Sequence, residues 1–223
     1  MSVLPLVAVL NLAAQCAPSV APEALLPLAR VESSWNTLAI DINHGPVVRA
    51  KSREEAEAVA SAYIRAGYSV DLGIAQINSR NLQRLGLTVG DAFDPCLNFR
   101  AAEVLLNENY ARASRQYSGI EAISRTFSLY NSGSFDVGFR NNYVAKVWRA
   151  AASISPLLRT QPVNTLSEIH DFVPSTPAED RQDNGTEAGT TGHEYPETSR
   201  LAPARRNLPS WLVVPVTQTK IVF

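Results

Sequence analysis

One carboxyl side chain, that of Glu32, stands where a charge is costly. It follows Leu25 and Leu28 at helical spacing, and Trp35 continues the same apolar series. The position is near the carboxyl end of the predicted helix, where the helix dipole disfavours a negative charge. Burial of the stripe would act in the same direction, because desolvation favours the neutral acid. Glu32 is therefore a candidate proton donor near neutral pH; the alternative is a helix-end glutamate with no task.

Three later segments carry the kinds of side chain that bind sugars. Amides bond hydroxyl and N-acetyl groups, and a tyrosine offers an apolar face with a polar tip. The segments are "DLGIAQIN", "SLYNSG" and "NNYVAKVW", and the side chains concerned are Gln76, Asn78, Tyr130, Asn131 and Tyr143. Taken singly, each of them could equally be an ordinary amide or a packing aromatic residue.

The surrounding sequence predicts a mainly α fold. Apolar residues recur at helical spacing in six stretches, over 21–32, 52–67, 78–86, 98–113, 119–133 and 141–154. Ser52 and Glu55 fit a capping box, Asn98 is expected to cap the helix over 98–113, and Pro27 is expected to kink or delay the helix over 21–32. Few stretches alternate with period two, so at most a small β element is predicted, near 70–77.

The composition limits the classes of function. The chain has 223 residues and a formal net charge of −1, which gives no sign of nucleic-acid binding or of a polybasic membrane anchor. Its three histidines and two cysteines form no cluster with metal-ligand spacing, so no metal and no cofactor is predicted. Cys16 and Cys96 could remain thiols, or could form one bridge in an oxidising compartment.

The apolar start of the chain, from Val3 to Ala14, is interpreted as the first helix of the domain. It is too short to cross a bilayer as a helix, so no transmembrane segment is predicted. No Lys or Arg precedes it, and Gln15 before Cys16 does not suit a lipoprotein signal. Any export signal is therefore atypical or missing from this start.

The character of the sequence changes after residue 154. Of the 14 prolines, eight lie beyond this point, and acidic residues dominate 168–197 without a helical or strand period. We therefore expect a folded domain over 1–154 and a Pro-rich, acidic, largely disordered tail over 155–223. The apolar end of the tail could be a docking segment or a loosely packed terminus.

Taken in order, "VESSWN", "GIAQIN" and "LYNSG" resemble the lytic transglycosylase domain related to goose-type lysozyme. "QCAPSVAPEALLPLARVESSWN", "DLGIAQINSRNLQRLGL" and "FDPCLNFRAAEVLL" look like one branch, the wall-cleaving lytic transglycosylases of type IV secretion and conjugation systems. The resemblance covers roughly 14–152. It implies a lysozyme-like fold, peptidoglycan as the substrate, a periplasmic location and other secretion-system components as partners.

The resemblance also implies roles for individual residues. Glu32 takes the family's acid position and works alone: it protonates the glycosidic oxygen, then takes the proton of the C6 hydroxyl. That hydroxyl closes onto C1, so the product is a 1,6-anhydro sugar and no water is consumed. Tyr130 is the expected hydrogen-bonding neighbour of Glu32. The implied substrate-binding positions are Gln76, Asn78, Tyr130, Asn131 and Tyr143.

The periplasmic location implied by the resemblance also predicts a disulfide between Cys16 and Cys96. It would close a loop of roughly 80 residues and contribute on the order of 4 kcal/mol. Two rival functions stay open. One is a hydrolytic lysozyme assisted by Asp41 or Asp71, although turn or surface roles are favoured for both aspartates. The other is a wall-binding assembly protein that does not cleave.

Overall fold

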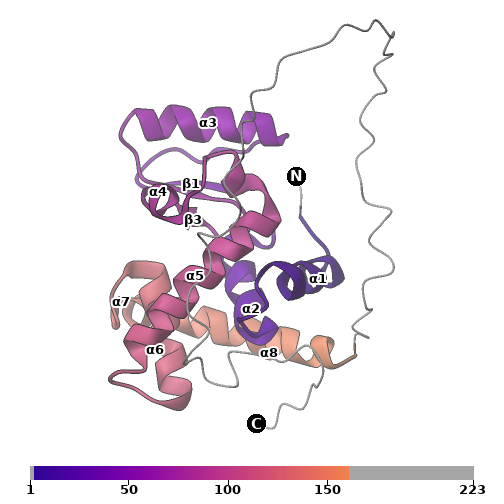
Figure 1. The fold of residues 1–223 in the computed structure, drawn as a ribbon, viewed down its shortest axis with the longest axis vertical. Helices are drawn as coiled ribbons and strands as arrows, with labels where there is room; N and C mark the ends of the chain where they lie inside the picture. The colour runs from indigo at the N-terminus through magenta and orange to yellow at the C-terminus, as the bar shows by residue number, and fades with distance from the viewer. Residues whose placement is uncertain (1–2, 161–223) are drawn as a thin grey trace, which may run out of the picture. The chain divides into compact units, whose positions relative to one another are not determined.

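The computed structural model describes residues 3–160, which form helices beside a small antiparallel sheet (Figure 1). The mainly α, lysozyme-like fold with a minor β element is as the sequence predicts. The elements are α1 (Leu6–Cys16), α2 (Pro22–Ser33), β1 (Ile40–Ile42), α3 (Arg53–Arg65), β2 (Val70–Leu72), β3 (Ile77–Asn78), η1 (Ser79–Asn81), α4 (Leu82–Leu85), η2 (Asp91–Phe93), α5 (Pro95–Ala113), α6 (Gly119–Ser132), α7 (Val137–Arg140) and α8 (Tyr143–Thr160).

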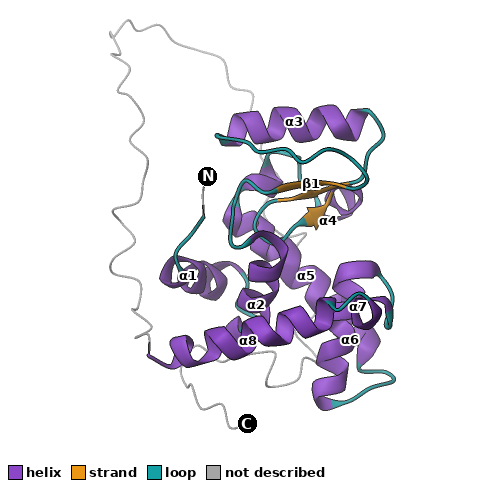
Figure 2. Cartoon of the chain, turned by 180° about the vertical axis from the view of Figure 1, so that it is seen from behind, coloured by secondary structure: helices purple, strands orange, loops and turns teal. Residues whose placement is uncertain are grey.

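The helical core is centred on α2, which packs against α8 (Figures 1 and 2). Leu25 and Leu28 of α2 and Val147 of α8 are fully buried. Pro27 does not break α2, although it lies inside the helix and is itself buried. α8 continues past residue 154, where the domain was expected to end, and runs to Thr160. The remainder of the expected tail lies outside the described residues.

The first turn of α5 corrects one expectation about the caps. The helix begins at Pro95, and the carboxylate of Asp94 accepts hydrogen bonds from the N–H groups of Cys96 and Leu97, both at 2.9 Å. Asn98 therefore lies inside the helix rather than at its cap, and it is fully buried. A carboxylate that satisfies two free N–H groups at a helix start is a better cap than an amide one turn further on.

Buried Asn98 holds the loop that precedes β3. Its Nδ2 donates to the carbonyls of Leu72 (2.9 Å) and Ala92 (2.7 Å), and its Oδ1 accepts from the N–H of Ala75 (2.8 Å). Gly73 lies against the same amide at φ +76°, and a Cβ there would come within 2.4 Å of Asn98 Nδ2. The loop consequently needs glycine at this position.

The sheet has the order β1-β2-β3, and every pair in it is antiparallel. Asp41 lies opposite Asp71, and Asp71 lies opposite Asn78 on its other side. Side chains alternate between the two faces of a strand, so Val70 and Leu72 are buried while Asp71 faces the other way. α3 packs against this sheet (Figure 2), and its Ala56 and Ala60 are buried.

The N-terminal segment is a core helix, as expected. Val9 and Ala13 of α1 are buried, and α1 contacts both α2 and α5. A disulfide joins Cys16 to Cys96 at the start of α5, with a Cα–Cα distance of 5.2 Å, which confirms the predicted pair. Among residues 3–160, the helices are too short or too polar to cross a bilayer.

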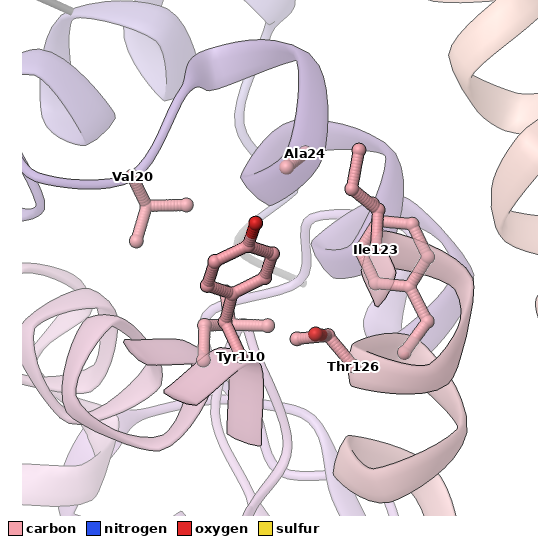
Figure 3. Close-up of a pocket in the computed structure, with 7 residues that line it drawn as sticks. Val20, Ala24, Tyr110, Ile123 and Thr126 are labelled. Atoms are coloured by element: carbon pink, nitrogen blue, oxygen red, sulfur yellow. The ribbon is translucent and has the colours of Figure 1, made fainter. Parts of the chain in front are cut away.

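A small void remains in the core between α2, α5 and α6. Figure 3 shows the ring of Tyr110 beside Val20 and Ala24, with Ile123 and Thr126 on the opposite side. Its volume is about 10 Å³, which is room for about one water-sized sphere. The void is too small and too apolar to hold a sugar, so a substrate site must lie elsewhere.

Candidate active site

A cleft of about 1000 Å³ runs between the sheet with its connections and the helices α5 and α6. Five of the six residues expected at a site line it, and they are Glu32, Gln76, Asn78, Tyr130 and Asn131. The sixth, Tyr143, lies behind the wall, with 6% of its surface exposed. The structure therefore brings residues separated by up to 99 positions in the sequence to one cleft.

Glu32 occupies the last turn of α2, where the chain reverses sharply. Ser34 and Trp35 both adopt left-handed backbone angles, with φ of 55° and 64°. The hydroxyl of Ser33 donates to the carbonyl of Ile74 at 2.6 Å, and the indole N–H of Trp35 donates back to Leu26 at 3.0 Å. These two contacts, from residues that follow Glu32, fix the end of the helix that carries the glutamate.

The surroundings of Glu32 favour its neutral form. Burial raises the pKa of Glu32 to about 7, against 4.5 for the free side chain. A hydrogen bond from Tyr143 opposes this rise, and the negative charges of Asp71 and Asp41 add to it. Glu32 can consequently hold a proton near neutral pH, which is the state that a general acid needs.

Tyr143, and not Tyr130, is the hydrogen-bond partner of Glu32. The Tyr143 hydroxyl donates to Glu32 Oε1. Tyr143 is the first residue of α8, and α8 packs along α2, which carries the glutamate. Tyr130 instead donates its hydroxyl to the carbonyl of Ala75 at 2.8 Å, because its helix faces the loop before β3.

Both phenols keep their protons near the acid. Burial, together with the charge of Glu32, raises the pKa of Tyr143 well above its ordinary value. Burial and the charges of Glu32 and Asp71 raise the pKa of Tyr130 in the same way. Each phenol is thus a permanent hydrogen-bond donor: Tyr143 donates to the acid, and Tyr130 to the loop that carries Gln76.

Gln76 is held by backbone carbonyls. It adopts a left-handed conformation with φ of 53°, which turns its side chain back over the loop. Its Nε2 donates to the carbonyl of Gly73 at 2.8 Å and to that of Ala39 at 3.3 Å. With both amide hydrogens directed at the protein, the carbonyl oxygen Oε1 is the atom that Gln76 can offer to a ligand.

The amide of Asn78 is used inside the protein. Its Nδ2 donates to Asp71 at 2.7 Å and to the hydroxyl of Ser69 at 2.8 Å, and its Oδ1 accepts from the N–H of Arg80 at 3.1 Å. A second amide, that of Asn43, donates to the other carboxylate oxygen of Asp71 at 2.9 Å. Asn78 thus holds a neighbouring carboxylate and the start of η1.

Asp71 is not the turn or surface aspartate that was favoured from the sequence. It lies in the middle of β2, is partly buried, and lines the cleft together with Asp41 and Glu32. Burial raises its pKa, and the hydrogen bonds from Asn78 and Asn43 oppose that rise. The Asp71–Asn43 contact spans 28 residues and depends on strand pairing, so no local pattern indicated it.

Asn131 connects the end of α6 to the start of α8. Its Oδ1 accepts from Nδ2 of Asn141 at 2.8 Å, and the Oδ1 of Asn141 accepts from the N–H of Tyr143 at 3.0 Å. Asn131 is exposed and lines the cleft, and its Nδ2 is an amide donor. Within residues 3–160, no group of three or more His, Cys, Asp or Glu side chains is arranged to hold a metal ion.

Comparison with known proteins agrees with this geometry. The transglycosylase SLT domain family matches residues 10–151. Protein virB1 of Agrobacterium fabrum is 39% identical over 153 residues, which cover 68% of this chain and 62% of that protein, so the match spans less than two thirds of this relative. No solved structure gives a significant match.

Relatives from Brucella match over more of their length. The type IV secretion system protein virB1 of Brucella abortus is 32% identical over 227 residues, covering 89% of this chain and 95% of that protein. The protein of the same name from Brucella suis matches to the same extent. With the family domain spanning most of the chain and the Glu32, glutamine and tyrosine motifs gathered in one cleft, the chain belongs to the transglycosylase SLT domain family and is similar to the type IV secretion system virB1 proteins.

Proposed function

We propose that this protein cleaves the β-1,4 bond between N-acetylmuramic acid and N-acetylglucosamine in peptidoglycan, and that cleavage leaves a 1,6-anhydro end. The observation that supports this most is the state of Glu32. It is a carboxyl group with a pKa of about 7 at the wall of a large cleft, with a phenol donating to it. Such a group can give a proton and take one back within a single reaction at neutral pH.

In the first step Glu32 acts as the acid. Its proton passes to the O4 oxygen of the N-acetylglucosamine unit as the bond from that oxygen to C1 of muramic acid breaks. C1 then carries oxocarbenium character, which the N-acetyl group of the same sugar can stabilise. The negative charges of Asp71 and Asp41 lie at the same cleft and favour this developing positive charge.

In the second step the ionised Glu32 acts as the base. It takes the proton of the C6 hydroxyl while the C6 oxygen bonds to C1, which closes the anhydro ring and restores the neutral acid. The Tyr143 hydroxyl donates to the carboxylate during the interval in which Glu32 is charged. Proton gain and loss balance, and no water enters the reaction.

The remaining site residues position the glycan in this scheme. Gln76 offers Oε1, which can accept from a sugar hydroxyl or an N-acetyl N–H, and Asn131 offers an amide donor. Tyr130 keeps the Gln76 loop in place through Ala75, and Asn78 acts indirectly by holding Asp71. Correct placement of this kind contributes to catalysis by fixing the reacting atoms in register.

The cellular setting of this activity is also a proposal. The relatives are named as type IV secretion proteins, so we infer that the enzyme opens the periplasmic wall locally for a secretion apparatus. The folded domain would supply cleavage, and the segment beyond it would serve contact with other components of that apparatus. An activity confined to the assembly site fits an enzyme that must not lyse its own cell.

Mass spectrometry of peptidoglycan digested with the purified protein tests the reaction. Fragments with 1,6-anhydro ends support the transglycosylase. Fragments with reducing ends would instead show that water attacks C1, and Asp71 would then be the candidate second carboxylate of a hydrolase. If no fragments form at all, the protein is a wall-binding component rather than an enzyme.

A further inference from the structure

Three arginines line the cleft, and they differ in what their guanidinium groups contact. Arg84 bonds both carboxylate oxygens of Glu108, at 2.7 and 2.9 Å. Arg112 lies over the ring of Phe135, 5.9 Å from its centre. The guanidinium of Arg80 makes no ion pair or hydrogen bond with any residue of the described range 3–160. A cation without a partner inside a binding cleft is available to a ligand.

The backbone of Arg80 is fixed although its side chain is exposed. Its N–H donates to Oδ1 of Asn78 at 3.1 Å, and Asn78 is bound in turn to Asp71 and Ser69 of the sheet side. The side chain therefore projects from a rigid base beside the reaction centre. A fixed base lowers the entropy lost when a ligand orders the rest of the side chain.

The charge of the cleft indicates which part of the substrate Arg80 would meet. The centre is acidic, with Asp41 and Asp71 beside Glu32. The glycan backbone of peptidoglycan carries no charge where the lactyl groups are joined to peptides. The anionic groups of intact peptidoglycan are then the carboxylates of its peptide stems, which the acidic centre repels.

We propose that Arg80 binds a carboxylate of a peptide stem and so makes the enzyme prefer stem-bearing glycan to glycan stripped of peptides. This inference rests on the proposed function, because it takes peptidoglycan to be the substrate. A guanidinium presents paired donors that match the two oxygens of a carboxylate, which neither an amide nor a hydroxyl can do. Arg80 is thereby a specificity-determining residue.

The test compares two substrates with full-length protein. One is glycan with intact stems, and the other is the same glycan after an amidase has removed them, which leaves a lactyl carboxylate on each muramic acid. We expect Arg80→Ala to lower the ratio of kcat/KM for stem-bearing over stripped glycan by about three- to fivefold, the upper part of the range of an exposed ion pair. Arg80→Lys should restore part of the ratio, and added salt should reduce the preference of the wild type.

The matched control is Arg149→Ala, because Arg149 is an exposed arginine of α8 that does not line the cleft. Its ratio should equal that of the wild type. An unchanged ratio for Arg80→Ala would overturn the inference. Equal losses of activity on both substrates would overturn it too, because Arg80 would then contact the glycan, the lactyl carboxylate or the fold rather than the stem.

A binding measurement separates this inference from the proposed function. In a Glu32→Gln background, cosedimentation with the two glycans needs no cleavage, and Arg80→Ala should weaken binding to the stem-bearing glycan selectively. If the wild type cuts neither substrate but this selective loss persists, the proposed reaction is wrong and the stem contact stands. If the wild type cleaves glycan but Arg80→Ala causes no selective loss of binding, the proposed reaction stands and the stem contact is wrong.

Discussion

Glu32 and Asp71 face the same cleft, one from the end of a helix and the other from the middle of a strand. Burial raises the pKa of both carboxyl groups. Their hydrogen-bond partners differ: Glu32 receives one bond, from the phenol of Tyr143, whereas Asp71 receives two, from the amides of Asn43 and Asn78. Donors stabilise an ionised carboxylate, so Asp71 is the better supported of the two as an anion.

The difference gives separate roles to the two walls of the cleft, the helix wall at the end of α2 and the strand wall formed by the sheet. The helix wall keeps a proton on Glu32 by burial, and the strand wall adds negative charge that opposes loss of that proton. Differences in burial and in hydrogen-bond donors can thus favour the neutral acid at one carboxyl group and the anion at its neighbour. Substitution of one member of this pair, or of one of its donors, therefore tests the difference.

The largest expected effect comes from removing the acid. Glu32→Gln keeps the size and the hydrogen bond to Tyr143 but cannot give a proton, so release of soluble fragments from cell-wall sacculi should fall by about 10³-fold. Circular dichroism should show an unaltered helical fold. Substantial remaining cleavage by a folded variant would remove Glu32 from the mechanism.

The same substitution should change how stability depends on pH. Folded Glu32 has a pKa of about 7 against 4.5 for the free group, so between these values the unfolded chain loses its proton first and stability falls as pH rises. Below 4.5 both states are protonated and the contribution vanishes. Urea unfolding should therefore show Glu32→Gln more stable than wild type by about 3 kcal/mol at pH 8, but not at pH 4.

A constant difference between the two proteins at pH 4, 6 and 8 would contradict this prediction, because it would reflect packing rather than protonation. A further control is Glu108→Gln, which alters an exposed, ion-paired glutamate of the same cleft. It should not reproduce the pH-dependent gain in stability.

Loss of the Tyr143 phenol should raise the pKa of Glu32, whereas loss of a negatively charged neighbour should lower it. Tyr143→Phe removes the hydrogen bond that lowers the pKa of Glu32, so that pKa should rise further. The alkaline limb of kcat/KM should move to higher pH, while kcat falls about tenfold because the carboxylate of the second step loses a donor. Tyr130→Phe is the comparison, since its hydroxyl bonds Ala75 instead, and it should leave the position of the limb in place.

Much of this fold follows from local patterns in the sequence. The Ser52 cap is confirmed, with its hydroxyl accepting from the N–H of Glu55 at 3.2 Å, and α6 ends at Gly133 as expected. Glu32 was identifiable because a charge in an apolar helical stripe is itself a local signal. Caps, stops and stripes need only neighbouring residues, which is why they can be predicted without a structure.

The contacts that tune the site could not be predicted in this way. Tyr130 was the expected neighbour of Glu32, but which tyrosine reaches Glu32 depends on the packing of α8 against α2, and that packing brings Tyr143 to it. Asn98 was expected to cap a helix, which is a role that local sequence can suggest. Its actual role is to bond the loop 73–76, and this depends on a segment far away in sequence lying on α5. Pairing across distant segments is decided by tertiary structure, which single-sequence patterns do not contain.

The smallest effect, and the sharpest test of the comparison, is expected from Asp71→Asn. This change removes a negative charge that raises the pKa of Glu32, so the alkaline limb of kcat/KM should move to lower pH, opposite to Tyr143→Phe. Activity at pH 7 should fall by about two- to fivefold, as for other partly exposed charge interactions. Asn43→Ala, measured beside it, removes a donor to Asp71 without removing its charge and should move the limb less. If Asp71→Asn instead moves the limb upward, or abolishes cleavage as fully as Glu32→Gln, then Asp71 takes a direct part in the chemistry and the two walls do not divide the work as argued.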